Sequence, residues 1–190
     1  MANKVRFGLS NVHYSLISES GGNITFATPV AWRGAVSLTV DVQADTNKFY
    51  ADNGVWASFD SATGGTATLE MADVPESVYT DLLGFVKIAS TGEIVENTTP
   101  ISQEFALLFE VSGNTDPIGY RLYRCTLSRP GLSANTTNES TDPETSSFTL
   151  TYMPIENGNV HTIKSHQVLD TAAKKTAFYE SVALPEIPSA

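Results

Sequence analysis

Alternation of apolar and polar residues dominates this chain and predicts β-strands along most of its length. Three valines and Leu38 occupy alternate positions of 36–42, as in a strand with one buried and one wet face. The segment EFALLFEV (104–111) is apolar at nearly every position, which is typical of a strand covered on both faces. We therefore predict a mainly β fold of roughly eight or more antiparallel strands, arranged as a β-sandwich or partly closed barrel.

The first strand is expected to contain an irregularity. Apolar residues occupy odd positions from 5 to 9 and even positions from 12 to 16. Because successive side chains of a strand face opposite sides, this change of parity at Ser10-Asn11 predicts a bulge or bend. A final hairpin is expected between FTLTYMP (148–154) and VHTIKS (160–165).

Two helices are expected to interrupt the strands. Asp73-Val74-Pro75-Glu76 is compatible with a capping box, and the apolar residues in 78–83 share one face of a flanking helix of about three turns. A C-terminal helix is predicted over 170–184, with Asp170 or Thr171 as its cap. The polar, turn-rich segment 130–147 is predicted to form a long loop or extended arm.

An aromatic segment, residues 46–59 (TNKFYADNGVWASF), connects two of the predicted strands. Asn53-Gly54 favours a two-residue hairpin turn, and we expect a ribbon that projects from the sheet. Exposed aromatic area of this kind marks a binding surface, although the ribbon could instead fold back and complete the core. The candidate inter-subunit contacts are Phe49, Tyr50, Asn53, Gly54, Val55 and Trp56.

The charge balance excludes several classes of partner. Of 190 residues, 21 are acidic and 11 are basic, for a formal net charge of −10, which disfavours gripping nucleic acid or an anionic membrane. No apolar segment approaches the roughly 20 residues that span a bilayer, and no signal sequence is recognised at the start. We expect one domain over 1–190, synthesised in a cytoplasm.

Catalytic and metal-binding motifs are not recognised in the sequence. His13, His161 and His166 lack zinc-like spacing, and no serine lies in a nucleophile elbow. Gly64-Gly65 resembles an ordinary turn pair, and Cys125, within an apolar run, is predicted to be a buried, inert thiol. The sequence therefore predicts a protein that is not an enzyme and needs no cofactor or metal.

Five motifs in order resemble a known family. KVRFGLSNVHY (4–14), TNKFYADNGVW (46–56), ADVPESVYTDLLG (72–84), FALLFEVSG (105–113) and YRLYRCTLSRP (120–130) resemble the major tail proteins of long-tailed siphophages and prophages. The resemblance extends from Asn3 to about Pro154, and it is closest to the tail-tube subunit of a siphophage with a Gram-positive host.

This resemblance implies a tail-tube fold flanked by a helix, with subunits that form hexameric rings stacked into a tube. The implied partners are further copies of the chain and the tape-measure, terminator and distal tail proteins, with DNA passing through without adhering. The implied location is the phage tail of the virion, and the segments 46–59 and 130–147 are candidate contacts between copies. Acids that face the bore would repel DNA phosphates, and the candidates are Asp41, Asp45, Asp52, Asp60 and Glu70.

Two alternative functions stay open from the sequence. A tail-terminator or head–tail joining protein would stop at a single ring, whereas a tube subunit would polymerise further. A carbohydrate-binding β-sandwich module would use Tyr50 and Trp56 as platforms on which sugar rings stack.

Overall fold

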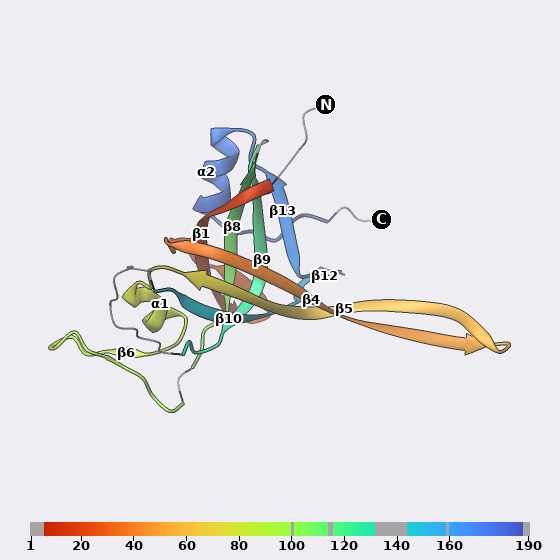
Figure 1. Ribbon diagram of the computed structural model, residues 1–190, viewed down its shortest axis with the longest axis horizontal. Coiled ribbons are helices and arrows are strands. Elements are labelled where there is room, and N and C mark those ends of the chain that lie inside the picture. Colours follow the sequence, from red (N-terminus) through yellow and green to blue (C-terminus); the bar gives the residue numbers. More distant parts are fainter. Residues whose placement is uncertain (1–5, 100, 114–115, 132–143, 159, 188–190) are drawn as a thin grey trace, which may run out of the picture.

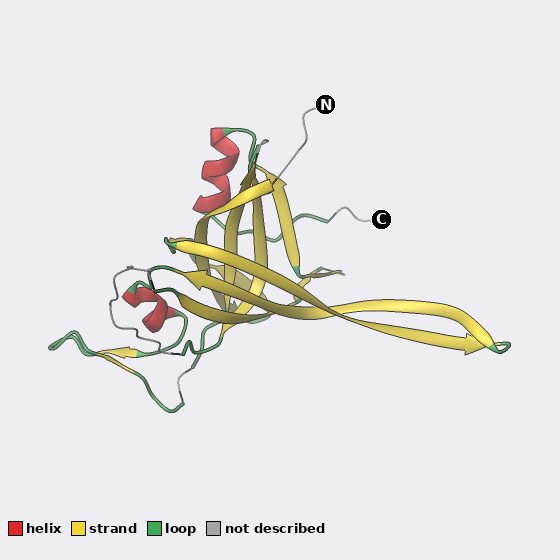
Figure 2. Cartoon of the chain, in the orientation of Figure 1, coloured by secondary structure: helices red, strands yellow, loops and turns green. Residues whose placement is uncertain are grey.

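Antiparallel pairing organises the chain into one nine-stranded sheet (Figures 1 and 2). The computed structural model describes residues 6–99, 101–113, 116–131, 144–158 and 160–187. The strand order is β2-β1-β8-β9-β10-β5-β4, with β3 paired to β1 and β13 paired to β9. The predicted mainly β, antiparallel fold is confirmed. The strands of this sheet are β1 (Arg6–Ser20), β2 (Asn23–Phe26), β3 (Val30–Ala31), β4 (Ala35–Ala51), β5 (Gly54–Met71), β8 (Phe105–Gly113), β9 (Ile118–Leu127), β10 (Ser146–Met153) and β13 (Lys164–Val168).

Smaller elements are attached to this sheet. Two short hairpins pair β6 (Val86–Lys87) with β7 (Ile94–Val95) and β11 (Ile155–Asn157) with β12 (Val160–Thr162). The helices are α1 (Glu76–Asp81) and α2 (Ala172–Glu180).

The irregularity predicted in β1 is present. Asn11 has a φ of 52°, in the left-handed region that asparagine tolerates better than most residues, and the register with β8 shifts between Ser10 and His13. Val12 and Tyr14 on the far side of the shift are buried. The bulge thus allows β1 to present apolar residues to the core along both halves.

β8 separates two hydrophobic cores. Phe105, Leu107 and Phe109 contribute to the first core, which α1 covers. Ala106 and Leu108, on the opposite face, contribute to the second core, which lies beneath α2. The prediction that this strand is covered on both faces is confirmed.

The sheet curls because the segment after β3 connects its two ends. The Trp32 amide donates to the Val12 carbonyl oxygen (2.8 Å), and the Ala72 amide donates to the Gly34 carbonyl oxygen (2.7 Å). The buried indole of Trp32 packs edge-on against Phe148 of β10 at a centroid distance of 5.2 Å. The result is a partly closed barrel around the first core.

α1 differs from its prediction in length and in its cap. It has six residues rather than three turns, and its N-cap is Pro75, which makes no side-chain capping bond. The predicted capping box is wrong because a capping side chain must belong to the N-cap residue, and Asp73 lies two residues earlier. Leu82 and Leu83 follow the helix and are nevertheless buried in the first core.

α2 confirms the predicted C-terminal helix, over a shorter span than 170–184. Thr171 caps it by accepting a hydrogen bond from the Lys174 amide (3.3 Å). Phe178 is buried in the second core beneath the Arg121 guanidinium, which lies 4.0 Å from the ring centroid. The buried Glu110 carboxylate on β8 accepts a hydrogen bond from Lys175 (3.0 Å) and so fixes the helix to the sheet.

The predicted final hairpin is wrong in its pairing. β10 pairs with β5 and β9, so both of its edges are occupied, and β12 pairs with β11 instead. The predicted polar loop at 130–147 ends earlier, because Ser146 already begins β10. Residues 132–143 of that loop lie outside the described residues.

Candidate assembly interface

The β4–β5 hairpin extends far beyond the sheet to which it belongs (Figure 1). β10 pairs with β5 as far as Tyr152 opposite Gly65. Beyond that point β4 and β5 pair with each other up to the tip. Residues 46–59 form the outer part of this hairpin, so the aromatic segment is a two-stranded ribbon attached to the sheet at its base.

Two glycines allow the ribbon to leave the sheet at this place. A Cβ on Gly65 would lie 2.1 Å from the Asp41 carbonyl oxygen and 2.3 Å from the Tyr152 hydroxyl, and a Cβ on Gly64 would lie 2.3 Å from the Tyr152 carbonyl oxygen. The Tyr152 hydroxyl donates to the Asp41 carbonyl oxygen (2.8 Å) across this gap. The interpretation of Gly64-Gly65 as a turn pair is wrong, because both residues lie inside β5, where the missing Cβ atoms admit Tyr152.

A two-residue turn of Asp52 and Asn53 closes the tip. Their φ angles are 49° and 63°, and Ala51 pairs with Gly54. Two positive φ angles are typical of the type I′ turn, which matches the twist of the flanking strands. The turn lies one residue earlier than predicted from Asn53-Gly54, because Gly54 already belongs to β5.

Four large apolar side chains near the tip are exposed to solvent. The exposed fractions are 58% for Phe49, 65% for Tyr50, 54% for Val55 and 68% for Trp56. Tyr50 lies opposite Val55, and a register shift follows before Phe49 pairs with Ala57. The ribbon therefore does not fold back to complete the core of its own chain. Contact between these residues and another subunit stays a prediction.

Two of the five candidate channel acids share one surface of the sheet. Asp41 of β4 and Glu70 of β5 each alternate along their strand with residues of the first core, so both carboxylates face away from that core. Asp52 lies apart from them, at the hairpin tip. The side chains of Asp45 and Asp60 lie outside the described residues.

Hydroxyl groups cover the rest of this surface. Where β4, β5 and β10 pair residue for residue, the described residues that alternate with those of the first core are all Ser, Thr, Asp or Glu, and Val36 is exposed at the irregularity beside Ser37. Thr39, Thr68 and Thr149 lie opposite one another in a row across the three strands. We call this surface the hydroxyl face, and its residues are Ser37, Thr39, Asp41, Thr66, Thr68, Glu70, Ser147, Thr149 and Thr151.

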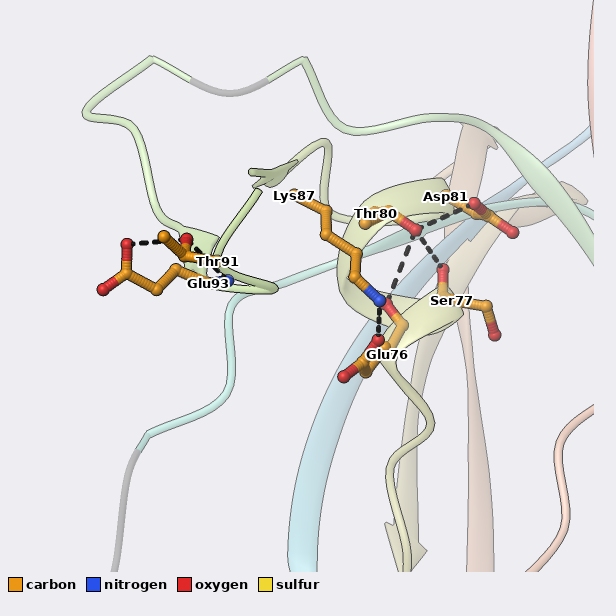
Figure 3. A network of polar contacts seen from close by, with 7 residues as sticks. All are labelled: Glu76, Ser77, Thr80, Asp81, Lys87, Thr91 and Glu93. Atoms are coloured by element: carbon orange, nitrogen blue, oxygen red, sulfur yellow. Dashed lines mark hydrogen bonds and ion pairs between the residues drawn. The ribbon is translucent and has the colours of Figure 1, made fainter. Parts of the chain in front are cut away.

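A second projecting segment, residues 85–99, was not predicted from the sequence, and we call it the arm. It contains β6 and β7 and extends away from the hairpin in Figure 1. Figure 3 shows that Lys87 of the arm forms an ion pair with Glu76 of α1. Val86 and Val95, which lie opposite each other, are exposed. Val86, Ile88, Ile94 and Val95 around Gly92 are a weak signal, because two-residue strands are too short to show an alternation.

The described residues offer little for catalysis or metal binding. Among them, no group of three or more His, Cys, Asp or Glu side chains could hold a metal ion. Burial raises the pKa of the Cys125 thiol to about 12, so the thiol stays protonated at neutral pH, as an inert core residue does. No helix in the described part of the chain has the length and apolar character that crossing a membrane requires.

Comparison with solved structures identifies chains with a similar fold. The tube-terminating cap of the anti-feeding prophage is 14% identical, with a TM-score of 0.47, and the match covers 88% of this chain and 95% of that chain. The sheath–tube complex of the PVC extracellular contractile injection system includes a chain that is 12% identical, with a TM-score of 0.41 and coverage of 83% and 88%.

Sequence comparison gives the family. Among curated proteins, none is similar enough in sequence to count as a relative. The family model described as "Phage tail tube protein" matches residues 36–185, which include the hairpin, the hydroxyl face, the arm and α2. This chain belongs to the phage tail tube protein family.

Proposed function

We propose that this chain is the major tail-tube subunit of a long-tailed siphophage, and that it polymerises as stacked hexameric rings. Family membership makes it a structural protein of the phage tail rather than an enzyme. The observation that carries the finer proposal is the projecting hairpin, on which Phe49, Tyr50 and Trp56 stay more than half exposed on the isolated chain. Apolar area of this kind is covered when a partner binds, and a tube supplies identical partners.

The hydroxyl face is our candidate for the surface that lines the bore. Its short Ser and Thr side chains and its two carboxylates, Asp41 and Glu70, offer DNA phosphates no cationic partner. Like charges repel the duplex, so DNA would pass without adhering to the wall. We propose this face rather than the five acids as one set, because Asp52 lies apart from it at the hairpin tip.

The strand edges suit lateral joining of copies into a ring. β4 is the last strand in the order of the sheet, and no described strand pairs with its outer edge. An open edge offers unpaired amides and carbonyls that can pair with a strand of another chain. We propose that such pairing extends the sheet from one copy to the next around the ring.

Electron microscopy of the purified full-length chain tests this function. We expect hollow tubes of variable length in negative stain, with six copies in each ring. Tubes that never exceed a single ring would favour a terminator or joining protein instead. A protein that stays monomeric under all assembly conditions and binds glycans would support the carbohydrate-binding alternative and contradict ours.

A further inference from the structure

A cavity of about 470 Å³ lies at the base of the arm, remote from the hairpin. Its walls come from α1, the arm and the adjoining ends of β9 and β10. The rings of Tyr79 and Phe85 stack in its wall, with centroids 5.9 Å apart and planes 23° from parallel. The cavity thus offers an aromatic surface of a size suited to one or two inserted side chains.

Arg129 provides a fixed cation in the same wall. Its guanidinium donates to the Glu96 carboxylate (2.9 Å) and to the carbonyl oxygens of Asn97 (3.1 Å) and Thr98 (3.3 Å). These contacts hold the group in place while its side chain stays 43% exposed. A guanidinium that is held and exposed in this way can stack on an aromatic ring.

We propose that the hairpin tip of a second copy of this chain inserts into this cavity, which we call the arm pocket. The tip carries Trp56 and Tyr50, whose ring faces attract a guanidinium, and Lys48 lies nearby. The arm pocket presents Arg129 to the rings, and Glu96 supplies a carboxylate for the lysine. The two surfaces therefore offer two complementary pairs, aromatic rings with a guanidinium and a lysine with a carboxylate.

The occupant must be another copy because of where the two features lie. In Figure 1 the hairpin and the arm extend from opposite ends of the molecule. The continuous β4–β5 ladder carries the tip away from α1, so a chain cannot fill its own arm pocket. Two different surfaces at opposite ends make a head-to-tail contact, which closes into a ring or continues as a filament according to the rotation between copies. This inference rests on the proposed tube function and names the surfaces that join its subunits.

Site-directed cross-linking tests the inference on assembled full-length chains. Gly54→Cys places a thiol at the tip and Gly131→Cys places one in the arm pocket, and at both positions a Cβ meets nothing within 4 Å. The matched control is Gln167→Cys on the exposed strand β13. Cys125 is buried and does not compete. A short bismaleimide is added to tubes grown from equal mixtures of two variants.

We expect the mixture of Gly54→Cys and Gly131→Cys to give at least roughly tenfold more cross-linked dimer than the mixture of Gly54→Cys and Gln167→Cys, because held neighbours react at millimolar effective concentration. Tubes that form normally but give no excess of cross-linked dimer would overturn the proposal that the tip inserts into the arm pocket. They would leave the tube function intact. Failure of the unsubstituted chain to form tubes would reject the tube function itself.

A double-mutant cycle decides the matter if a cysteine variant does not assemble. Trp56→Ala and Arg129→Gln should each raise the critical concentration for assembly about tenfold, which corresponds to about 1.4 kcal/mol. The double variant should be little worse than either single one, since both remove the same contact. Fully additive effects would show that Trp56 and Arg129 act at separate places and would contradict the proposal.

Discussion

Gly65 illustrates how one position determines where the hairpin leaves the sheet. Tyr152 of β10 covers the backbone of Gly65 and reaches across to the Asp41 carbonyl oxygen on β4. Any side chain at Gly65 would occupy the space of that hydroxyl. The three strands are therefore fixed together at the last point at which they all pair.

Gly65→Ala is predicted to destabilise the folded monomer by about 1–3 kcal/mol, because the added methyl group overpacks this site. Chemical denaturation followed by tyrosine and tryptophan fluorescence measures the change. Gly54→Ala is the control, since its Cβ meets nothing within 4 Å, and we expect a change within about 0.5 kcal/mol. Equal effects at both positions would contradict the packing described for Tyr152.

Glu70 provides a prediction about pH. Hydrogen bonds from Thr145 (2.5 Å) and Ser37 (3.0 Å) lower the pKa of its carboxyl below the ordinary value of 4.5. A lowered pKa means that these bonds stabilise the fold above pH 4.5 and that this contribution is lost as the pH falls through the lowered value. Thr145→Val should therefore raise the pKa of Glu70 toward 4.5 in a carbon-13 NMR titration. An unchanged pKa would show that Thr145 is not the main cause.

The hairpin and the arm show what sequence patterns can and cannot reveal about single segments. The alternation in β4 and β5, the Asp-Asn-Gly turn and the aromatic residues together predict a ribbon, because all three signals are local. The arm was missed because its strands have two residues each, too few for a pattern to emerge. The role of Gly64-Gly65 depends on Tyr152, which is distant in sequence, and no local pattern contains that contact.

Trp56→Ala should separate assembly from folding. The Trp56 side chain is 68% exposed on the isolated chain, so its removal should change monomer stability by less than about 0.5 kcal/mol. If a neighbouring copy buries the indole, the Trp56→Ala substitution should raise the critical concentration for assembly about tenfold or more. Urea denaturation of the monomer and light scattering during assembly measure the two effects. A variant that unfolds outright would instead place Trp56 in the core.

For the molecule as a whole, the sequence predicted the class of fold well, and it did not predict which acids share a surface of the sheet. Antiparallel strands, the doubly covered strand β8 and a C-terminal helix followed from periodicity. The separation of Asp52 from Asp41 and Glu70 did not follow from periodicity, because it depends on how far the hairpin extends past β10. The register of the sheet decides which acids share a surface, and the register cannot be derived from composition and spacing.

Charge on the hydroxyl face should affect the passage of DNA rather than the assembly of the tube. Asp41→Lys combined with Glu70→Lys places two cations in each copy where our proposal locates the bore, and should slow DNA release from purified particles. Glu180→Lys combined with Glu186→Lys changes the net charge equally, at exposed positions distant from that face, and should leave release unchanged. Normal DNA release from particles that carry Asp41→Lys and Glu70→Lys would reject the hydroxyl face as the wall of the bore.

The central claim is that this chain functions by joining copies of itself through its projecting hairpin. A cryo-electron microscopy reconstruction of tubes grown from the purified chain, at a resolution that shows side chains, tests it most directly. Our account predicts that Tyr50 and Trp56 are buried against a neighbouring copy in every ring. Tubes in which both side chains remain open to solvent would contradict it.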